Sequence, residues 1–374
     1  MSIRFLHTAD LQIGKTFRQF PPDVASKLRD ARFETLKRTA SLARDRRVDA
    51  VLVAGDCFDG PAVGEDVLRS FKVALEPFDG MWVLLPGNHD PATAESVWAR
   101  LCSFSLPRNV VIAGEPSPIP IAAKAVLLPA PLRRRSETTD LTQWFDTAAT
   151  GERLIRVGLA HGSVQELLPE GSEAHNPIAR DRAERAGLDY LALGDWHGRL
   201  KVSVRSGYSG TPEPDRFRRN EPGHVLEVTI DGPGAMPAVA AIAVGRYLGM
   251  ERAIDLSRGG ADEIRDDIRR AIGESDQELE RLVLRLQYRG TIDFATKIAL
   301  DDVRGDLRAR VCYLEDDDIG LSPVPTDDDL DSIDTAGFIR VGMNRLREKL
   351  GGPDAPTARR ALEVLYGLHH RDRR

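Results

Sequence analysis

A chain of 374 residues is longer than one small core requires and predicts two or three domains. Its hydrophobic content of 41%, charged content of 29% and net charge of −6 fit a globular protein without a membrane span, since no apolar run approaches ~18 residues. The three cysteines, odd in number and far apart, argue against a disulfide framework. Together with the lack of a signal peptide, they predict a cytoplasmic protein.

The first hundred residues alternate between predicted strands and helices. Short apolar strands begin at Ile3 and span 51–54 and 82–85, with helices at 23–47, 64–75 and 93–104. This series predicts a parallel sheet with right-handed crossovers. Further strands are expected at 110–113, 125–128, 154–160 and 190–193, helices at 142–149 and 179–186, and antiparallel closing strands at 201–204 and 224–230. The expected fold class is α/β, with two sheets sandwiched between helices.

Turn-forming residues cluster at 231–237 and predict a domain boundary there. We expect an α/β sandwich domain over 1–233, a smaller α+β capping domain over 234–314, an acidic linker over 315–334 and a C-terminal helical pair over 335–374. The linker is inferred from two runs of acidic residues separated by prolines. Both final helices carry an apolar stripe, which we expect to pack on the protein itself, with docking to a partner helix as the alternative.

Five predicted strands are followed at once by Asp, Asn or His. Because the carboxyl ends of parallel strands meet at the ligand-binding edge of an α/β sheet, we expect these side chains to converge. Carboxylates, an amide and imidazoles without a thiolate suit Mn²⁺, with Mg²⁺ or Fe²⁺ as alternatives, better than structural zinc. The predicted ligands of two divalent metal ions are Asp10, Gln12, Asp56, Asn88, His161, Asp195 and His197.

Asp56 directly follows its strand and is the expected bridge between the two ions. One ion would also take Asp10, His197 and the weaker ligand Gln12; the other would take Asn88, His161 and Asp195. Such a pair lowers the pKa of a bridging water from 15.7 towards ~7 and so supplies hydroxide for an in-line phosphoryl displacement.

The leaving oxygen of that displacement needs a proton, and His89 is the candidate general acid. An acid of this kind needs an orienting group, and the carboxylates of Asp59 and Asp90 are available. Cys57 lies beside the bridge but should point away from it, so we expect it to be packed in the core.

The motifs stand in a fixed order: Asp-Leu-Gln at 10–12, Gly-Asp-Cys-Phe-Asp at 55–59, Gly-Asn-His-Asp at 87–90, His-Gly at 161–162 and Gly-Asp-Trp-His at 194–197. In them the chain resembles the calcineurin-like metallophosphoesterase superfamily, and within it the DNA-repair exonucleases of the SbcD type. The resemblance implies Mn²⁺-dependent hydrolysis of DNA phosphodiester bonds and a homodimer. It also implies a coiled-coil ATPase partner of the SbcC type, bound through the C-terminal helices.

Two positions depart from the pattern of that family. Gln12 and Asp195 each stand where the family has histidine, so each metal position lacks one imidazole. Aspartate is a competent ligand, whereas glutamine is a poorer one. These departures leave open a non-catalytic module that positions a partner, and the acidic net charge leaves open a phosphodiesterase for cyclic nucleotides or other small molecules.

Basic side chains follow the last motif and are candidates for contacting DNA phosphates. They are Arg199, Lys201, Arg216, Arg218 and Arg219. Exposed solubilising charge explains them equally well, because no aromatic platform or recognition helix accompanies them. The net charge of −6 does not decide between the two, since an enzyme acting on phosphodiesters can carry its positive charge locally.

Overall fold

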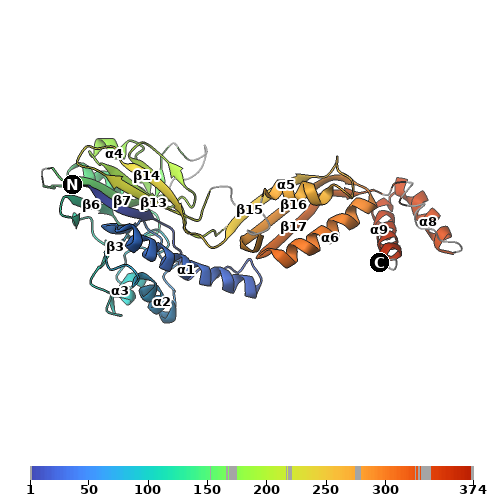
Figure 1. Ribbon diagram of the computed structural model, residues 1–374, viewed down its shortest axis with the longest axis horizontal. Helices are drawn as coiled ribbons and strands as arrows, with labels where there is room; N and C mark the ends of the chain where they lie inside the picture. The colour runs from blue at the N-terminus through green and yellow to red at the C-terminus, as the bar shows by residue number, and fades with distance from the viewer. Residues whose placement is uncertain are drawn as a thin grey trace. The chain divides into compact units, whose positions relative to one another are not determined.

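The computed structural model describes residues 2–151, 153–165, 167, 175–215, 217, 221–273, 279–324, 326, 329 and 338–371. The chain divides into two compact units, Met1–Leu248 and Gly249–Arg374, which we call the N-terminal unit and the C-terminal unit. Figure 1 shows the α/β architecture of the first and the small sheet and helices of the second.

Two six-stranded sheets form the N-terminal unit. The first sheet runs in the order β14 (Ala238–Ala243), β13 (His224–Ile230), β1 (Ile3–Thr8), β2 (Ala50–Val53), β3 (Met81–Leu84) and β4 (Val110–Ile112). The second runs in the order β11 (Leu200–Lys201), β12 (Ser206–Tyr208), β10 (Tyr190–Gly194), β7 (Ile155–His161), β6 (Ala125–Ala130) and β5 (Ile119–Ala122). The strands β1 to β4 are parallel, as are β12, β10, β7 and β6, and the other strands pair antiparallel. A separate short pair joins β8 (Ser163–Val164) to β9 (Pro177–Ile178).

The two sheets pack face to face through an apolar layer that includes Phe5, Leu52 and Leu159. The outer face of the first sheet is covered by α1 (Pro22–Arg46), α2 (Glu65–Leu75) and α3 (Val97–Cys102), and that of the second by η1 (Leu141–Asp146) and α4 (Arg182–Arg185). Because the strands are buried on both faces, β2 reads Ala-Val-Leu-Val without a polar residue. The expected two-sheet α/β sandwich is confirmed.

The helix boundaries follow local sequence signals. In α1, Leu28, Leu36, Ala40 and Ala43 are buried on one side, and the helix ends at Arg47, which takes a left-handed conformation with φ 53°. The helix α3 starts at its cap Ser96, whose side chain accepts a hydrogen bond from the Ala99 backbone N–H, and is shorter than the predicted 93–104.

The C-terminal unit contains a three-stranded sheet of β15 (Leu248–Asp255), β16 (Leu282–Ile292) and β17 (Tyr313–Pro323). Its helices are α5 (Ile264–Ile272), η2 (Leu279–Arg281), α6 (Phe294–Arg310), α8 (Phe338–Glu348), η3 (Lys349–Gly351) and α9 (Ala355–Arg371). The strands β16 and β17 are parallel, with α6 as their crossover. Met343, Leu362 and Tyr366 of the last two helices pack against Phe294, so their apolar stripes cover this unit itself. Within the described residues, no helix combines the length and apolar character needed to span a bilayer.

The structure corrects two of the expected boundaries. The first unit extends to residue 248 instead of 233. The chain reverses direction at 231–237, and β14, which follows this turn, pairs antiparallel with β13. Residues 315–323 of the expected acidic linker are part of β17, where Asp316 and Asp318 form ion pairs with Arg304 of α6. The rest of that linker, apart from Val324, Thr326 and Asp329, lies outside the described residues.

Candidate metal centre

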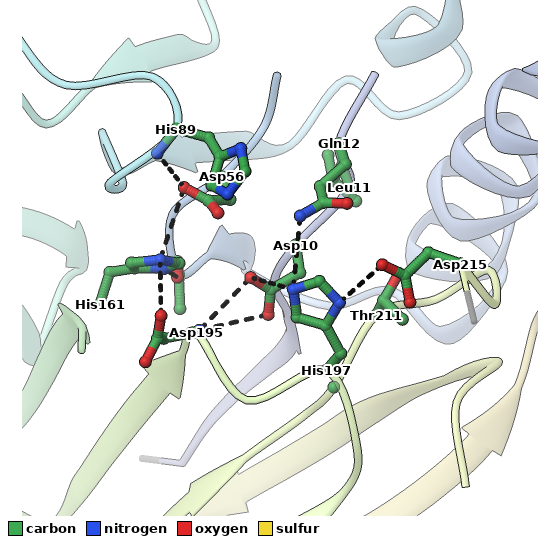
Figure 2. Close-up of polar contacts among 12 residues, drawn as sticks. Asp10, Leu11, Gln12, Asp56, His89, His161, Asp195, His197, Thr211 and Asp215 are labelled. Atoms are coloured by element: carbon green, nitrogen blue, oxygen red, sulfur yellow. Dashed lines mark hydrogen bonds and ion pairs between the residues drawn. The ribbon is translucent and has the colours of Figure 1, made fainter. Parts of the chain in front are cut away.

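The candidate metal centre lies where five parallel strands of the two sheets end. From the first sheet, β1, β2 and β3 lead to Asp10, Asp56 and Asn88; from the second, β7 ends at His161 and β10 leads to Asp195 and His197. The loops after β1 and β2 are joined by hydrogen bonds from the Asp10 N–H to the Gly55 carbonyl (3.1 Å) and from the Gln12 N–H to the Asp56 carbonyl (2.9 Å). These bonds hold the Asp10 and Asp56 side chains beside each other (Figure 2).

Left-handed backbone conformations mark the same residues. Asp10 has φ 53°, Gln12 has φ 43°, Asp56 has φ 52° and Asp195 has φ 102°. Residues other than glycine rarely take these values, and such strain concentrates at functional sites where the surrounding structure enforces it. These unusual conformations fall in the loops that follow β1, β2 and β10.

Three fully buried side chains form the centre of the cluster. One ligand atom each of Asp10, Asp56 and His161 lies within 4.8 Å of the other two. The His161 Nδ1 lies 2.8 Å from the Ala54 carbonyl oxygen, which can only accept, so Nδ1 carries the proton. The Nε2 of His161 therefore faces the carboxylates, 3.4 Å from Asp56 Oδ1 and 3.8 Å from Asp195 Oδ1.

The remaining predicted ligands surround this centre. The Asp195 backbone N–H lies 3.3 Å from both carboxylate oxygens of Asp10, and its own carboxylate accepts a hydrogen bond from Ser163 Oγ at 2.9 Å. The Nε2 of His197 lies 3.9 Å from Asp10 Oδ1, while its Nδ1 is 3.0 Å from Asp215 Oδ2. Figure 2 shows Asp10, Asp56, His161, Asp195 and His197 reaching into one region from separate segments of the chain, with Asp215 behind His197.

Two buried acceptors of the cluster fit a metal ion. Among the residues that the structure describes, Asn88 Oδ1 and His161 Nε2 are buried without a hydrogen-bond partner. Buried polar atoms are normally paired, so an unpaired amide oxygen and an unpaired imidazole nitrogen beside three carboxylates match the donor set of a divalent cation. The residues present therefore fit the metal ions that the sequence predicts.

The electrostatics of the cluster show a deficit of positive charge. Burial raises the pKa of Asp10 to about 6, even though His197 and His161 act in the opposite direction. For His161, burial favours the neutral ring, but the carboxylates of Asp56, Asp10 and Asp195 outweigh it and raise the pKa to about 9. Both raised pKa values mean that the site binds protons more tightly, because several carboxylates lie close together. Bound cations would neutralise the same negative charge.

Gln12 is held by a lysine that the sequence reading missed. The Lys15 Nζ donates to Gln12 Oε1 at 2.8 Å and also lies 3.2 Å from Asp59 Oδ1 and 3.6 Å from Asp215 Oδ2. The Gln12 Nε2 lies 3.3 Å from His197 Nε2. The side chain of Gln12 thus reaches the cluster with its amide nitrogen, and a lysine stands directly behind it.

His89 is oriented differently from the expectation. Its backbone N–H donates to Asp56 Oδ1 at 2.9 Å, and its Nδ1 lies 2.9 Å from the backbone carbonyl oxygen of Asp59. The carboxylate of Asp90 accepts the Gly87 and Phe58 N–H groups, at 2.6 and 2.9 Å, and that of Asp59 pairs with Lys15. The expectation that a carboxylate of Asp59 or Asp90 orients His89 is therefore wrong, because both carboxylates are engaged elsewhere.

Glycines of the motifs let neighbouring segments of the chain pack closely at the site. A Cβ at Gly87 would lie 2.2 Å from Asp56 Oδ1, and a Cβ at Gly194 would lie 1.8 Å from the Ala54 carbonyl oxygen. Any side chain at either position would displace a bridging carboxylate or separate the strands. The residues that the sequence reading missed, Lys15 and Asp215, lie in loops without a comparable signal.

The candidate DNA contacts lie beyond His197. Arg199 forms an ion pair with Glu221, and Lys201 is exposed at the end of β11. Both line an open cavity of about 590 Å³ with Tyr208 and Leu226. Arg216, Arg218 and Arg219 lie outside the described residues.

Comparisons with known proteins match the part of the chain that carries these residues. A family model described as calcineurin-like phosphoesterase matches residues 3–199. The chain is 27% identical over 277 residues to the DNA double-strand break repair protein Mre11 of Aeropyrum pernix, covering 69% of this chain and 65% of that one. It is 31% identical over 140 residues to the SbcD component of the nuclease SbcCD of Escherichia coli K12, covering 35% and 33%. It is 24% identical over 235 residues to the uncharacterized metallophosphoesterase YhaO of Bacillus subtilis, covering 54% and 50%.

The matched region covers only part of these relatives. The chain spans about half the length of YhaO and of the Mre11 of Methanosarcina acetivorans, at 50% and 46%. Among solved structures, TT1561 of Thermus thermophilus aligns over 65% of this chain and all of its own, with 12% identity and a TM-score of 0.41.

Proposed function

The chain belongs to the calcineurin-like phosphoesterase family, and we propose that it hydrolyses DNA phosphodiester bonds in a metal-dependent reaction, as an exonuclease of the SbcD or Mre11 kind. Relatives named as Mre11 and as the SbcD component of the nuclease SbcCD support the choice of DNA as substrate. The observation that carries the proposal is the buried cluster of Asp10, Asp56 and His161, whose ligand atoms lie within 4.8 Å of one another.

Two divalent ions, Mn²⁺ in this proposal, would be held by the residues at the strand ends. Asp10, His197 and the bridging Asp56 would hold one, with Gln12 beside them. Asp56, Asn88, His161 and Asp195 would hold the other. When bound, such a pair lowers the pKa of water towards ~7 and neutralises charge on a transferring phosphoryl group.

The contribution of His89 follows from its hydrogen bonds. A carbonyl oxygen only accepts, so the Nδ1 beside the Asp59 carbonyl carries a proton, and Nε2 is the atom left to exchange one. The bond from its backbone N–H to Asp56 Oδ1 fixes the residue beside the bridging carboxylate. In its doubly protonated form the ring would donate the Nε2 proton to the leaving oxygen of the DNA strand.

The test is a Mn²⁺-dependent assay that compares end-labelled DNA with a chromogenic phosphodiester. We expect both to be cleaved, and His89→Ala to reduce DNA cleavage by about a hundredfold or more, the usual contribution of a general acid. His175→Ala is the matched control, since His175 is an exposed histidine beside Ser136. Failure of the wild-type protein to cut single- or double-stranded DNA would refute the proposal.

The same assay separates two other functions. The net charge of −6 favours a phosphodiesterase for cyclic nucleotides or other small molecules, which would turn over the chromogenic substrate and leave DNA intact. Gln12 at a ligand position favours a non-catalytic module, which would cleave neither substrate and would bind well below two metal ions per chain.

We also propose a homodimer and a coiled-coil ATPase partner that docks on α8 and α9. The inner face of this helix pair packs on Phe294 of α6, while Val341, Val364 and Leu368 are about half exposed. Val364 and Leu368 are four residues apart on α9, and exposed apolar side chains at this helical spacing suit a partner helix. Co-purification with the ATPase should be lost in Val341→Asp if the helices carry the contact, and light scattering tests the dimer.

A further inference from the structure

The two halves of the metal centre differ in the charged groups that pair with their carboxylates. We call the half with Asn88, His161 and Asp195 the Asn88 side, and the half with Asp10, Gln12 and His197 the Gln12 side. On the Asn88 side, the ion pairs of Asp56 and Asp195 among the described residues are both with His161. On the Gln12 side, the Lys15 ammonium pairs with Asp59 and Asp215, and the Arg32 guanidinium, which is 3% exposed, donates to the Leu11 carbonyl at 2.6 Å. Among the described residues, the carboxylates beside Gln12 thus pair with a permanent cation of the protein, whereas Asp56 and Asp195 pair with a histidine.

The orientation of the Gln12 amide follows from Lys15. An ammonium group has only donors, so the group 2.8 Å from Lys15 Nζ must be the amide oxygen of Gln12. The NH₂ group then faces the cluster, 3.3 Å from His197 Nε2. An amide nitrogen that carries two hydrogens has no lone pair to offer a metal ion, so Gln12 in this orientation is not a ligand.

The same bond engages a second ligand. Asp215 Oδ2 lies 3.0 Å from His197 Nδ1, and a carboxylate accepts, so Nδ1 carries the proton and Nε2 holds the lone pair. That lone pair accepts a hydrogen bond from the Gln12 NH₂ group. Lys15 therefore removes one ligand of this position and, through Gln12, competes with a metal ion for another.

We propose that Lys15 makes the two metal positions unequal, so that the Asn88–His161–Asp195 position fills first and the Asp10–His197 position fills at higher metal concentration, after Gln12 turns. The inference rests on the proposed function only in taking the cluster as a two-metal site. Lys15 is a positioning residue, held in place by two carboxylates and acting on the metal through the Gln12 amide.

The experiment is a Mn²⁺ titration of the metal-free full-length protein without DNA, followed by calorimetry and by the paramagnetic resonance signal of Mn²⁺. We expect two binding steps whose affinities differ by about tenfold or more, with a signal of isolated ions after the first step and of coupled ions after the second. Lys15→Met frees the Gln12 oxygen to turn inward and should tighten the second step by about tenfold.

Two further variants keep the inference falsifiable. Gln12→His restores an imidazole and should also tighten the second step, whereas Asn88→Ala should weaken the first. Lys37→Met is the matched control, because Lys37 pairs with Glu34 on the surface of α1 and should leave both steps unchanged.

Two equal steps in the wild-type protein, or an unchanged second step in both Lys15→Met and Gln12→His, would overturn the inference. Two-step loading without DNA cleavage would leave it standing and remove the proposed function instead.

Discussion

Carboxylates are partly or fully buried in both units of this chain, but their neighbours differ. In the C-terminal unit, Asp316 of β17 is paired with Arg308 and lies 3.9 Å from Arg304, whose guanidinium also stacks over the Tyr288 ring at 4.4 Å. In the N-terminal unit, Asp10 and Asp56 lie beside imidazoles and each other. A buried carboxylate costs free energy unless a cation offsets its charge.

The two clusters of acidic residues therefore have different roles. Where the protein supplies the cations itself, the acids stabilise the fold, as between β17 and α6. Where it supplies unpaired acceptors instead, such as Asn88 Oδ1, the missing positive charge is left for a bound ion. Substitutions in both clusters test this distinction.

Asp56→Asn should have the largest effect, because it removes the bridging charge of the metal centre. We expect Mn²⁺-dependent turnover of a chromogenic diester to fall about a thousandfold, the scale of losing metal-ion stabilisation of several kcal/mol. Asp318→Asn in the C-terminal unit, where Asp318 pairs with Arg304, is the matched control and should leave turnover unchanged. Equal losses in both variants would contradict the distinction between the two units.

Arg304→Met should destabilise the C-terminal unit by about 2 to 3 kcal/mol, because it removes a buried cation that stacks over Tyr288 and pairs with Asp316 and Asp318. Asp316 then keeps only its ion pair with Arg308. Denaturant unfolding measures this loss, and Mn²⁺ binding by the metal centre should not change. Arg265→Met is the control: Arg265 pairs with Asp306 at 2.8 Å, but both are about half exposed, so the loss should stay below about 1 kcal/mol. A loss of similar size in both variants would show that burial does not set the energy.

The convergence of these side chains on one candidate metal centre could be predicted from the sequence because of how parallel strands end. Asp10, Asp56, Asn88, His161 and Asp195 each come at or just after a buried strand, and parallel strands of two packed sheets place those ends at one edge. The residues that support the ligands could not be predicted in the same way. Lys15 and Asp215 lie in loops, where the direction of a side chain depends on tertiary contacts.

Two features of the fold could not be predicted from the sequence, because they also depend on tertiary contacts. The acidic run in β17 resembles a linker because its partners, Arg304 and Arg308, lie on α6 and only the tertiary structure brings them together. The turn formers at 231–237 resemble a domain boundary, but they form the connection between β13 and β14. Local composition predicts a turn, but it does not show whether the next strand pairs with the previous one or belongs to another domain.

His7 is a buried histidine of the N-terminal unit whose two ring nitrogens both have hydrogen-bond partners. It tests whether such a side chain contributes to stability alone and not to metal binding. Its Nδ1 and Nε2 each lie 3.1 Å from a partner, the Tyr190 hydroxyl and the Leu193 carbonyl. Burial lowers its pKa to about 3, although the hydrogen bond with Leu193 acts in the opposite direction. The unfolded chain binds a proton near pH 6.5 and the folded protein does not. This contribution to stability is therefore present above pH 6.5 and is lost as the pH falls towards 3.

The expected loss from His7 is about 2 kcal/mol between pH 7 and pH 5. Chemical unfolding of metal-free protein at both values measures it, and His7→Gln should remove that part of the pH dependence. His224→Gln, which changes a half-buried histidine beside the Pro222 carbonyl, should keep it. The same pH dependence in wild type and His7→Gln would show that His7 does not carry the effect.

Lys201 should give the smallest effect, and it extends the distinction from buried carboxylates to exposed cations. Arg199 is already paired with Glu221, whereas Lys201 has no ion pair within the part of the chain that the structure describes. If Lys201 contacts a DNA phosphate, Lys201→Met should weaken DNA binding about fivefold at physiological salt and reduce the slope of log affinity against log salt by about 0.9. Arg199→Met should change both less, because Arg199 must first leave Glu221, and turnover of the chromogenic diester should stay constant in both. Every contact between a lysine and a DNA phosphate releases counterions and therefore contributes to the salt dependence of binding. If the slope is unchanged in Lys201→Met, Lys201 does not contact a phosphate and is a solubilising surface charge.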